Sequence, residues 1–430
     1  MKMLSPSGIS ARSARSVWRA TNKDMVKQVL SPESRLHTPK SLGFRMPAEW
    51  EPHEATWIGW PHNHTDWPGK FTPIPWVYGE IARKLVPREV VRVLVNNRQH
   101  EARARRVLGR IGVDLGSVEF FQFPTDRGWT RDFGPIFVRR GPPAPVAAAP
   151  ELEGTTTKPN RDEHPPRVPA SQQIASSELA IVRFRFNAWA KYPDWQMDDK
   201  VPDRVAGALR CPLLPARAGD RDFVLEGGSV DVNGRGTLIT TEECLLDPKV
   251  QVRNPGLGRQ QIERALKANL GVSNVLWLGC GIAGDDTHGH VDDVCRFVGP
   301  GTVLLCEESD ARDANYLPLA ENRERLQGMR LENGSRIEVI GLPMPAPLYV
   351  DGQRLPASYA NFYIADAAVL VPTFNDPNDR IALGILGELF RDRPVVGIHA
   401  VDLVWGLGTL HCLTQQQPAT SRMRQADDQH

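Results

Sequence analysis

Cys412, the last of six cysteines, is the residue of this sequence best suited to chemistry. It follows the glycine-flanked turn at 406–408 and precedes the polar run at 414–417, whereas a buried structural cysteine normally has apolar neighbours. A thiol in this setting is a candidate nucleophile if a histidine and carboxylates converge on it from elsewhere in the fold. The six cysteines form no CxxC pair and show no zinc-type spacing.

A second signal is the alternation of His288, His290 and Asp292. On a strand these side chains would share one face. Such a face could bind zinc, which would make the protein a metallohydrolase, although no second compact histidine cluster accompanies it. Alternatively, His290 performs acid/base work while Asp292 binds a cationic substrate. A purely structural hydrogen-bonded cluster is the third interpretation.

Two more polar clusters stand at the heads of predicted strands. Arg131 and Asp132 follow Trp129, which could pack on an alkyl chain or a planar cation, and Glu226 precedes two glycines that permit close backbone approach. Carboxylates match a guanidinium bidentately, and its central carbon is a poor electrophile. A thiolate and a proton donor for departing ammonia would be the minimum machinery. The residues alone indicate a cysteine-dependent enzyme acting on a cationic, guanidino group.

The composition excludes several classes of protein. Hydrophobic residues make up 41% and charged residues 24% of 430, which is typical of a soluble globular protein of two or three domains or of one repeat-built domain. A net charge of +1 argues against nucleic-acid or membrane partners, and no apolar run reaches the roughly 18 residues of a membrane span. Cysteines are too sparse for a disulfide scaffold, so we expect a cytoplasmic location.

Three segments are expected to lie outside the packed fold. Residues 1–43 form a basic, Ser/Arg-rich leader that we expect to be disordered, and we expect residues 1–40 to be dispensable. Residues 421–430 form a flexible tail. The Pro/Ala-rich stretch 141–178 shows no period of 2 or 3.6, which predicts a disordered insertion between strands at 135–139 and 180–186. The remainder, 44–420, is predicted to be a single catalytic domain.

The polar clusters recur at intervals of 54 to 68 residues once the insertion is left out, at Asp132, Glu226, His290, Ser358 and Cys412. Strands follow the clusters, and helical segments lie between them. One helix is expected at 259–270, where the apolar residues are spaced for a single face. The pattern predicts a pseudo-symmetric α/β array of about five units, with the polar clusters near one centre.

These motifs resemble the agmatine deiminase group of the Porphyromonas-type peptidyl-arginine deiminases. The resemblance covers about residues 44–420 apart from the insertion. Its ordered motifs are WIGWP at 57–61, WTRDFGP at 129–135, LEGG at 225–228, DTHGHVD at 286–292, SYANFY at 358–363 and HCLTQQ at 411–416.

The resemblance implies a five-bladed pseudo-symmetric α/β propeller built of strand-strand-helix-strand units. It also implies Cys412 as the nucleophile, His290 as the general acid/base, and Asp132 with Asp292 as the clamp on the guanidinium. Glu226 would be a further acidic partner near His290 or the substrate. No metal or cofactor is implied.

The implied reaction converts agmatine to N-carbamoylputrescine and ammonia through a cysteine thiouronium. For the substrate's other contacts we expect Trp129 against the methylene chain, Asp286 at the amine, and Arg131. Alternatives are deimination of arginine or peptidyl-arginine, amidino transfer, and a non-catalytic binding module. The expected partner is this small molecule, with a possible homo-oligomer.

The chain departs from the family pattern next to these residues. His288 stands where the agmatine enzymes commonly carry Asp, and Thr409 where they carry Asn. We therefore expect the reaction class to be more secure than the substrate.

Overall fold

The computed structural model describes residues 37–141 and 174–420, whose strands form five larger mixed sheets and two small hairpins. In each larger sheet, two strands pair antiparallel. One strand of this pair also pairs in parallel with a strand that follows it in the chain. A helix lies in every parallel connection. The structure thus has the predicted α/β class. The predicted recurring units correspond to five sheets whose strands are connected in the same way.

The strands of the larger sheets are grouped by hydrogen-bonded order. The first sheet comprises β21 (Thr414–Pro418), β2 (His53–Gly59), β3 (Val90–Leu94) and β4 (Val118–Phe121). The second comprises β1 (Phe44–Arg45), β5 (Ile136–Arg140), β6 (Leu179–Arg183) and β7 (Leu213–Pro215). The others are β10 (Asp231–Val232), β11 (Thr237–Thr241), β12 (Asn274–Leu278); β13 (Cys295–Phe297), β14 (Thr302–Glu307), β15 (Glu338–Pro343); and β18 (Tyr363–Ile364), β19 (Val369–Thr373), β20 (Val395–His399).

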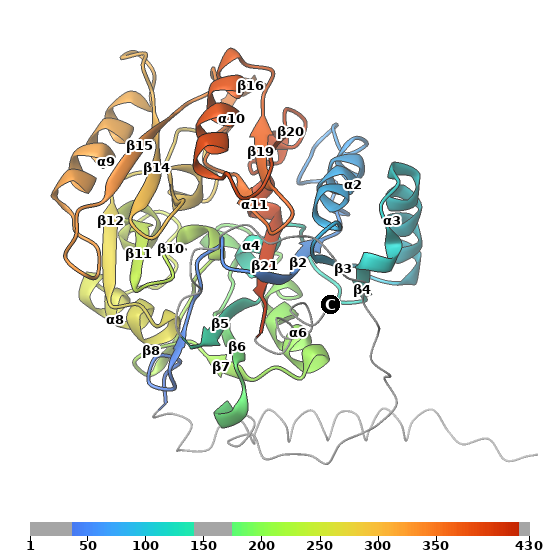
Figure 1. The fold of residues 1–430 in the computed structure, drawn as a ribbon, viewed down its shortest axis with the longest axis horizontal. Coiled ribbons are helices and arrows are strands. Elements are labelled where there is room, and N and C mark those ends of the chain that lie inside the picture. The colour runs from blue at the N-terminus through green and yellow to red at the C-terminus, as the bar shows by residue number, and fades with distance from the viewer. Residues whose placement is uncertain (1–36, 142–173, 421–430) are drawn as a thin grey trace, which may run out of the picture.

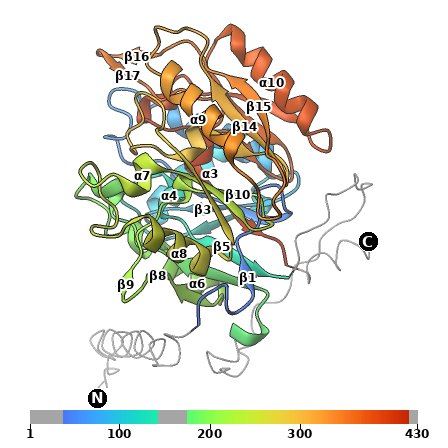
Figure 2. The same cartoon turned by 90° about the vertical axis from the view of Figure 1, so that its left-hand side faces the viewer.

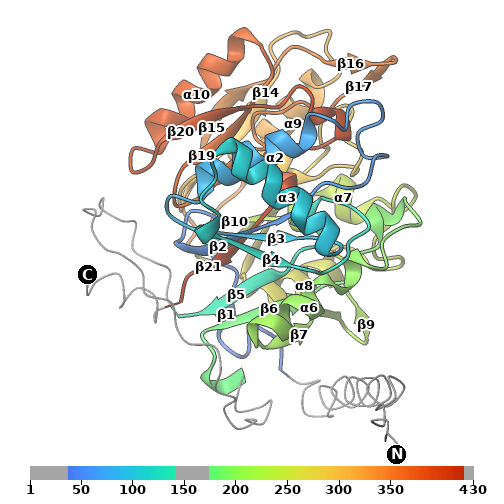
Figure 3. The ribbon, with the colours of Figure 1, turned by 90° about the vertical axis from the view of Figure 1, so that its right-hand side faces the viewer.

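Long helices lie on the outside of the sheets (Figure 1). They are α2 (Ile74–Leu85), α3 (Arg98–Ile111), α6 (Val201–Leu209), α8 (Arg259–Leu270), α9 (Tyr316–Gly328) and α10 (Pro377–Leu389), and the shorter α7 is Glu242–Leu246. The hairpins are β8 (Arg217–Ala218) with β9 (Arg221–Asp222), and β16 (Tyr349–Val350) with β17 (Gln353–Arg354). Figure 2 shows β14 and β15 above and β1 and β5 of the second sheet below, and Figure 3 shows α2 and α3 side by side.

Local sequence explains where these helices begin and end. The helix α8 has the predicted bounds and ends at Gly271, whose φ of 72° is the left-handed conformation that glycine favours. Its buried residues Ile262, Leu266 and Leu270 recur on one face. In α10, Asp376 accepts a hydrogen bond from the Asn378 backbone N–H, which satisfies a free donor of the first turn.

Two buried apolar clusters hold the sheets and helices together. The larger includes Trp57, Tyr78 and Phe362, and the smaller includes Phe223 and Leu266. In the central strand β19, Val369 to Val371 are all fully buried, as expected for a strand covered on both faces. No helix within 37–141 or 174–420 is long and apolar enough to cross a membrane.

Parts of the predicted leader and of the predicted insertion are among the described residues. Residues 1–36, 142–173 and 421–430, which hold most of the predicted leader, insertion and tail, lie outside the described residues. Lys40 of the predicted leader donates from Nζ to the Val272 carbonyl at 2.7 Å, and Arg140 donates to the carbonyls of Ile174 and Ala175. Lys40 of the predicted leader and residues 174 and 175 of the predicted insertion thus make contacts with other parts of the described chain.

Candidate active site

Five short turns converge between the sheets, and each precedes the first strand of one unit. They are α4 (Thr130–Phe133) before β5, η5 (Gly227–Ser229) before β10, η6 (Val291–Asp293) before β13, residues 358–361 before β18, and α11 (Leu410–Leu413) before β21. The turn α4 contacts both α11 and η5, and η5 contacts η6. Figure 1 shows α4 and α11 near the middle of the molecule. This shared position explains the regular spacing of the polar clusters.

Cys412 lies in α11 at a pocket that Trp129, Trp189 and Asp132 also line. The chain reaches it through Leu407 in a left-handed conformation and then Gly408. A Cβ at Gly408 would lie 3.2 Å from the Cys412 sulfur and 2.9 Å from the Trp129 ring, so glycine leaves room for the thiol. Burial and the charges of nearby aspartates raise the pKa of Cys412 well above its usual value. The unliganded thiol is therefore protonated at neutral pH.

Asn361 is the side chain that touches the sulfur, and sequence reasoning assigned it no role. Its Nδ2 donates to Cys412 Sγ at 3.1 Å and to Asp293 Oδ1 at 2.9 Å. Its Oδ1 accepts from the Thr409 hydroxyl at 2.8 Å and from the His411 backbone N–H at 3.0 Å. These two donors fix the orientation of the amide, so its N–H group must face the sulfur. The SYANFY motif was the signal that contained it.

His290 lies just before η6, buried among three carboxylates. Its Nδ1 is 3.8 Å from Asp132 Oδ1 and 3.9 Å from Asp292 Oδ1, and its Nε2 is 3.7 Å from Glu226 Oε2. Burial alone would lower the pKa of this imidazole, but the charge of Asp132 and other acidic neighbours raise it well above its usual value. The ring is thus protonated at neutral pH and can donate a proton.

Asp132 faces the pocket from α4. Its Oδ2 accepts from Trp189 Nε1 at 2.9 Å, and its Oδ1 accepts from the Gly228 backbone N–H at 3.1 Å. Burial raises its pKa to about 6, partly offset by the charge of His290. Asp132 is therefore largely ionised at pH 7, but close enough to its pKa to titrate in mildly acidic solution.

Asp292 offers one free oxygen to the site. Its Oδ2 accepts from His411 Nδ1 at 2.6 Å and lies 3.9 Å from Cys412 Sγ. No described residue donates a hydrogen bond to its buried Oδ1. Burial would raise the pKa of Asp292, but the hydrogen bond and charge of His411 lower it below the usual value. A buried, ionised carboxylate with one oxygen that accepts no hydrogen bond is suited to binding a cation.

Glu226 reaches His290 from the side opposite Asp132. It forms a 3.2 Å ion pair with the buried Arg253, and this pair outweighs the burial that would raise the pKa of Glu226, lowering it to about 2. Cys244 of α7 lies beside the same two groups, since ligand atoms of Glu226, Cys244 and His290 are all within 4.8 Å of one another. Neither Glu226 nor His290 is part of the pocket wall, and Glu226 contacts the His290 ring rather than the pocket.

Gly228 explains why the Glu-Gly-Gly motif carries two glycines. A Cβ at Gly228 would lie 2.6 Å from His290 Nδ1 and 3.0 Å from carboxylate oxygens of both Asp132 and Asp292. We expect Gly228→Ala to lower kcat/KM on the order of 100-fold by displacing these groups, because misplacing reacting groups by about 1 Å has effects of that size. Gly207→Ala, on the open surface of α6, is the matched control. Steady-state kinetics would contradict this expectation if Gly228→Ala matched the control.

Two of the residues predicted to contact the substrate, Trp129 and Asp286, line the pocket. Trp129 lines it and packs on Trp67 with ring centroids 5.1 Å apart. Asp286 also lines it, but its carboxylate already pairs with Lys191 and accepts from the Tyr192 hydroxyl at 2.7 Å. Trp189, which sequence reasoning missed, completes the wall and holds Asp132.

Two sequence predictions are corrected by the structure. Arg131 is buried away from the pocket, where it donates to Gln416 Oε1 at 2.7 Å, to Glu49 and to the His411 carbonyl, so a substrate contact is not supported. His288 does not share a strand face with His290 and Asp292, because His288 and Gly289 both have positive φ and break the extended backbone. The His288 ring instead lies 2.9 Å from Asp247 Oδ2.

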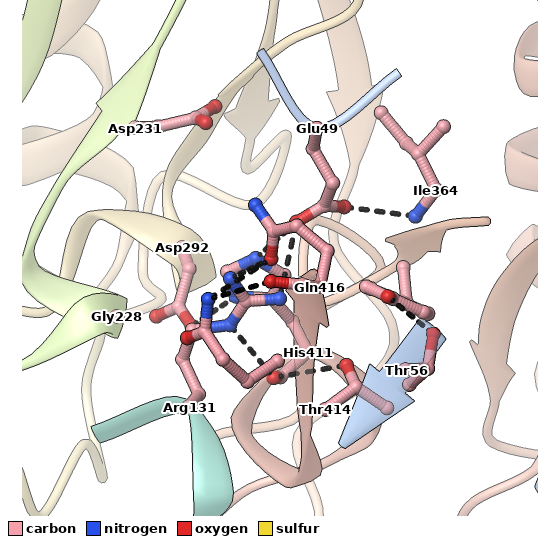
Figure 4. A network of polar contacts seen from close by, with 12 residues as sticks. Glu49, Thr56, Arg131, Gly228, Asp231, Asp292, Ile364, His411, Thr414 and Gln416 are labelled. Carbon is pink, nitrogen blue, oxygen red and sulfur yellow. Dashed lines mark hydrogen bonds and ion pairs between the residues drawn. The ribbon is translucent and has the colours of Figure 1, made fainter. Parts of the chain in front are cut away.

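A buried network of ion pairs lies behind Asp292 (Figure 4). His411 bridges Asp292 and Glu49, with Nε2 2.8 Å from Glu49 Oε2. Glu49 also pairs with Arg131 and Arg296, and Arg296 reaches Asp231. The residues of this network come from distant parts of the chain, since Glu49 precedes β2 and Arg296 lies in β13.

Two groups of described side chains bring together atoms that can bind a metal. They are Glu226, Cys244 and His290, and Asp292, Asp293 and Cys412. Neither contains His288, so the predicted His288–His290–Asp292 zinc set is not assembled. Both groups share residues with the thiol site, and burial and the charge of Asp292 raise the pKa of Asp293 well above its usual value.

The chain was compared with known proteins. The family model of the Porphyromonas-type peptidyl-arginine deiminases matches residues 45–418. A relative described as agmatine deiminase from Pseudomonas aeruginosa is 36% identical over 406 residues, covering 89% of this chain and 97% of its own length. One from Medicago truncatula is 36% identical over 409 residues, with 89% and 98% covered. A solved structure of agmatine deiminase from Enterococcus faecalis has 31% identity and a TM-score of 0.73, covering 89% of this chain and 98% of that one.

Proposed function

Because the chain belongs to the Porphyromonas-type peptidyl-arginine deiminase family, we propose that it hydrolyses agmatine to N-carbamoylputrescine and ammonia. The observation that carries this proposal is the convergence of Cys412, His290, Asp132 and Asp292. Cys412 and Asp132 line one pocket, Asp292 Oδ2 lies 3.9 Å from Cys412 Sγ, and His290 Nδ1 lies 3.8 Å from Asp132 Oδ1. The naming of relatives as agmatine deiminases supports the choice of substrate.

In the proposed complex, the guanidinium lies between the carboxylates of Asp132 and Asp292. Asp292 Oδ1 has no hydrogen-bond donor among the described residues, and Asp132 lines the pocket directly. Guanidinium N–H groups would satisfy these oxygens by charge-assisted hydrogen bonds. Binding the cation would also offset the negative charge that raises the pKa of Cys412, so substrate itself would favour the thiolate.

The Cys412 thiol would release its proton to solvent as the cation binds, and the resulting thiolate would attack the guanidinium carbon. Asn361 Nδ2 donates to the sulfur and would stabilise its negative charge. As the C–N bond breaks, protonated His290 gives its proton to the leaving nitrogen, which departs as ammonia. His290, now neutral, takes a proton from water, whose oxygen attacks the thiouronium carbon, and the C–S bond breaks. The hydroxyl proton of this adduct passes to the departing sulfur as the carbonyl forms, so the ureido product leaves and the thiol is restored.

The pocket carries an excess of negative charge that supports an amine at the far end of the substrate. Its wall includes Asp66, Asp286 and Arg127, and Asp194 and Lys191 pair with these groups. Three carboxylates against two cations leave an excess negative charge, which favours an ammonium group over the carboxylate of free arginine. Trp129 would lie against the methylene chain.

The pH dependence of this reaction follows from Asp132. Its pKa of about 6 means that the carboxylate becomes neutral as the pH falls through 6, and the guanidinium then loses one anionic partner. We expect kcat/KM for agmatine to fall by about tenfold per pH unit below that value. A pH–rate profile that stays level from pH 7 to pH 5 would contradict the role of Asp132.

The experiment that tests the substrate is product analysis by mass spectrometry. EDTA-treated protein is incubated separately with agmatine, arginine and an arginine-containing peptide. A ureido product plus ammonia from agmatine is the expected result. Product from arginine or the peptide instead would replace the substrate, transfer of the amidino group to an added amine would indicate a transferase, and activity restored only by zinc would indicate a metal-dependent enzyme.

We also propose finer features of the architecture. The five sheets of one connectivity, with their first strands preceded by converging turns, support the five-bladed pseudo-symmetric propeller as one catalytic domain over about 44–420. A cytoplasmic location remains part of the proposal, as does a possible homo-oligomer. Deleting residues 1–36 and measuring turnover tests whether that segment is dispensable.

A further inference from the structure

Three buried side chains with metal-binding atoms meet on the side of His290 that faces away from Asp132. Ligand atoms of Glu226, Cys244 and His290 all lie within 4.8 Å of one another, and each residue is at most 3% exposed. None of the three lines the pocket that contains Cys412. This group therefore lies outside the proposed guanidinium position but shares His290 with the proposed reaction.

Two of the ligand atoms are buried without a hydrogen bond. Glu226 Oε2 and His290 Nε2 have no hydrogen-bond partner among the described residues. The two atoms are 3.7 Å apart, which is beyond hydrogen-bonding distance. Buried polar atoms are nearly always satisfied, so two unsatisfied atoms that face each other indicate a place for a small bound group. Cys244 brings its sulfur to the same place.

The atom types and their separation fit zinc. Zinc bonds to nitrogen and oxygen of about 2.1 Å, at a tetrahedral angle, place the two ligand atoms about 3.4 Å apart. Glu226 Oε2 and His290 Nε2, at 3.7 Å, are close to that separation. A thiolate ligand selects Zn²⁺ over Mg²⁺ and Ca²⁺, which prefer oxygen ligands. Three protein ligands leave the fourth tetrahedral position to a water molecule.

Neighbouring residues hold these side chains in position. Arg253 Nε donates to Glu226 Oε1 at 3.2 Å, which leaves Oε2 as the oxygen that faces the histidine ring. Thr241 Oγ1 accepts from the Cys244 backbone N–H at 3.1 Å, and its hydroxyl donates to the Gly289 carbonyl. Thr241 thus joins the helix α7 to the segment that carries the histidine. Such outer contacts orient the ligands of metal sites.

We propose that Glu226, Cys244 and His290 form an inhibitory site for a zinc-class divalent cation, which stops turnover by coordinating His290 Nε2. The proposal rests on the proposed function, because inhibition follows from the role of His290 as proton donor. The cation takes the place of the hydrogens on His290 Nε2 and Cys244 Sγ. One Zn²⁺ enters as two protons leave, so the net charge of the buried group is unchanged.

The zinc-bound ring could not perform acid/base work. Its Nδ1, which faces Asp132 at 3.8 Å, would keep its hydrogen. Giving up that hydrogen would leave an imidazolate on the metal instead of a neutral imidazole, which is far less favourable. With Nδ1 already protonated, the ring could not accept a proton from water either. Both the release of ammonia and the activation of water would therefore stop.

Inhibition kinetics test this effect on the proposed reaction. Protein freed of metal by EDTA, with the EDTA then removed, is incubated with Zn²⁺ before agmatine is added. We expect saturating Zn²⁺ to lower kcat at least about 100-fold, the scale of general acid/base catalysis, with little change in KM. Inhibition that agmatine relieves competitively would overturn the proposal, because it would place the cation at Asp292, Asp293 and Cys412.

Cys244→Ser removes the thiolate ligand. We expect the inhibition constant for Zn²⁺ to rise at least about tenfold in this variant, with each rate expressed relative to the same protein without metal. Cys211→Ser, at a thiol that bonds to the Leu179 carbonyl, is the matched control and should keep the wild-type inhibition constant. An equal inhibition constant in Cys244→Ser and the wild type would overturn the proposal.

Co²⁺ spectroscopy tests the site without substrate. Co²⁺ bound by a thiolate has a charge-transfer band in the near ultraviolet. We expect this band in the wild type and in Cys412→Ala, and its loss in Cys244→Ser. A band absent from the wild type, kept in Cys244→Ser or lost in Cys412→Ala would overturn the site.

Two further results separate the parts of the proposal. If Cys244→Ser does not fold, X-ray absorption of Zn²⁺-loaded Cys412→Ala decides, because we expect sulfur and imidazole in the zinc shell, and a shell without sulfur would overturn the site. Zn²⁺ bound here without a fall in kcat would overturn the inhibitory role. If the Co²⁺ band behaves as expected but no guanidino compound is turned over, the proposed function fails while the metal site stands.

Discussion

Cys412→Ala is expected to abolish deiminase turnover, lowering kcat by at least about 10⁴-fold, because removing the nucleophile of a covalent mechanism leaves no alternative route to the thiouronium. The fold should survive. The sulfur is buried but small, and Asn361 Nδ2 keeps its second partner, Asp293 Oδ1, at 2.9 Å. We therefore expect the free energy of unfolding to change by about 1 kcal/mol.

Steady-state kinetics and urea unfolding of the same preparation measure both effects. Cys211→Ala, at a half-buried thiol whose hydrogen bond is to the Leu179 carbonyl, is the matched control and should keep full turnover. Full activity in Cys412→Ala would end the assignment of Cys412 as the nucleophile. Loss of activity in both variants would point to a general effect of thiol removal.

Asp132→Asn is expected to have two effects of opposite sign. The neutral amide removes one anionic partner of the guanidinium, and it can accept only one of the two hydrogen bonds that Trp189 and Gly228 donate to the carboxylate. Breaking a buried ion pair from one side typically costs about 3–5 kcal/mol, which corresponds to a loss in kcat/KM of about 150- to 5,000-fold.

The Cys412 thiol, in contrast, should become more reactive in this variant. Asp132 is one of the carboxylates that raise its pKa, so removing that charge favours the thiolate. We expect iodoacetamide to alkylate Cys412 faster in Asp132→Asn than in the wild type at the same pH. Asp220→Asn in the exposed turn between β8 and β9 should change neither measurement. Slower alkylation, or an unchanged kcat/KM, would contradict the placement of Asp132.

Local sequence was sufficient for the features that depend on neighbouring residues. The bounds of α8 follow from its apolar spacing and the glycine that ends it, and the turn at Gly299 to Gly301 joins β13 and β14 as expected. The recurrence of polar clusters also reflects a real geometric rule, since each precedes the first strand of a unit. Cys412, His290, Asp132 and Asp292 were therefore predictable as a group.

Features that depend on tertiary contacts were not predictable. His411 and Glu49 are 362 residues apart in the chain, and nothing local distinguishes this histidine from a surface one. Arg131 looked like a substrate ligand because it adjoins Asp132, yet neighbouring residues of the short turn α4 point to different partners. The strand expected at 288–292 failed because Gly289 permits a positive φ that alternation cannot reveal.

The covalent intermediate provides the most direct test of the central claim. Wild-type protein mixed with agmatine is quenched in acid within the first turnover, digested, and examined by mass spectrometry. The account predicts that the peptide containing Cys412 gains the mass of agmatine less ammonia, and that Cys412→Ala gains nothing. Turnover of agmatine without any adduct on Cys412, or with the adduct on another residue, would contradict it.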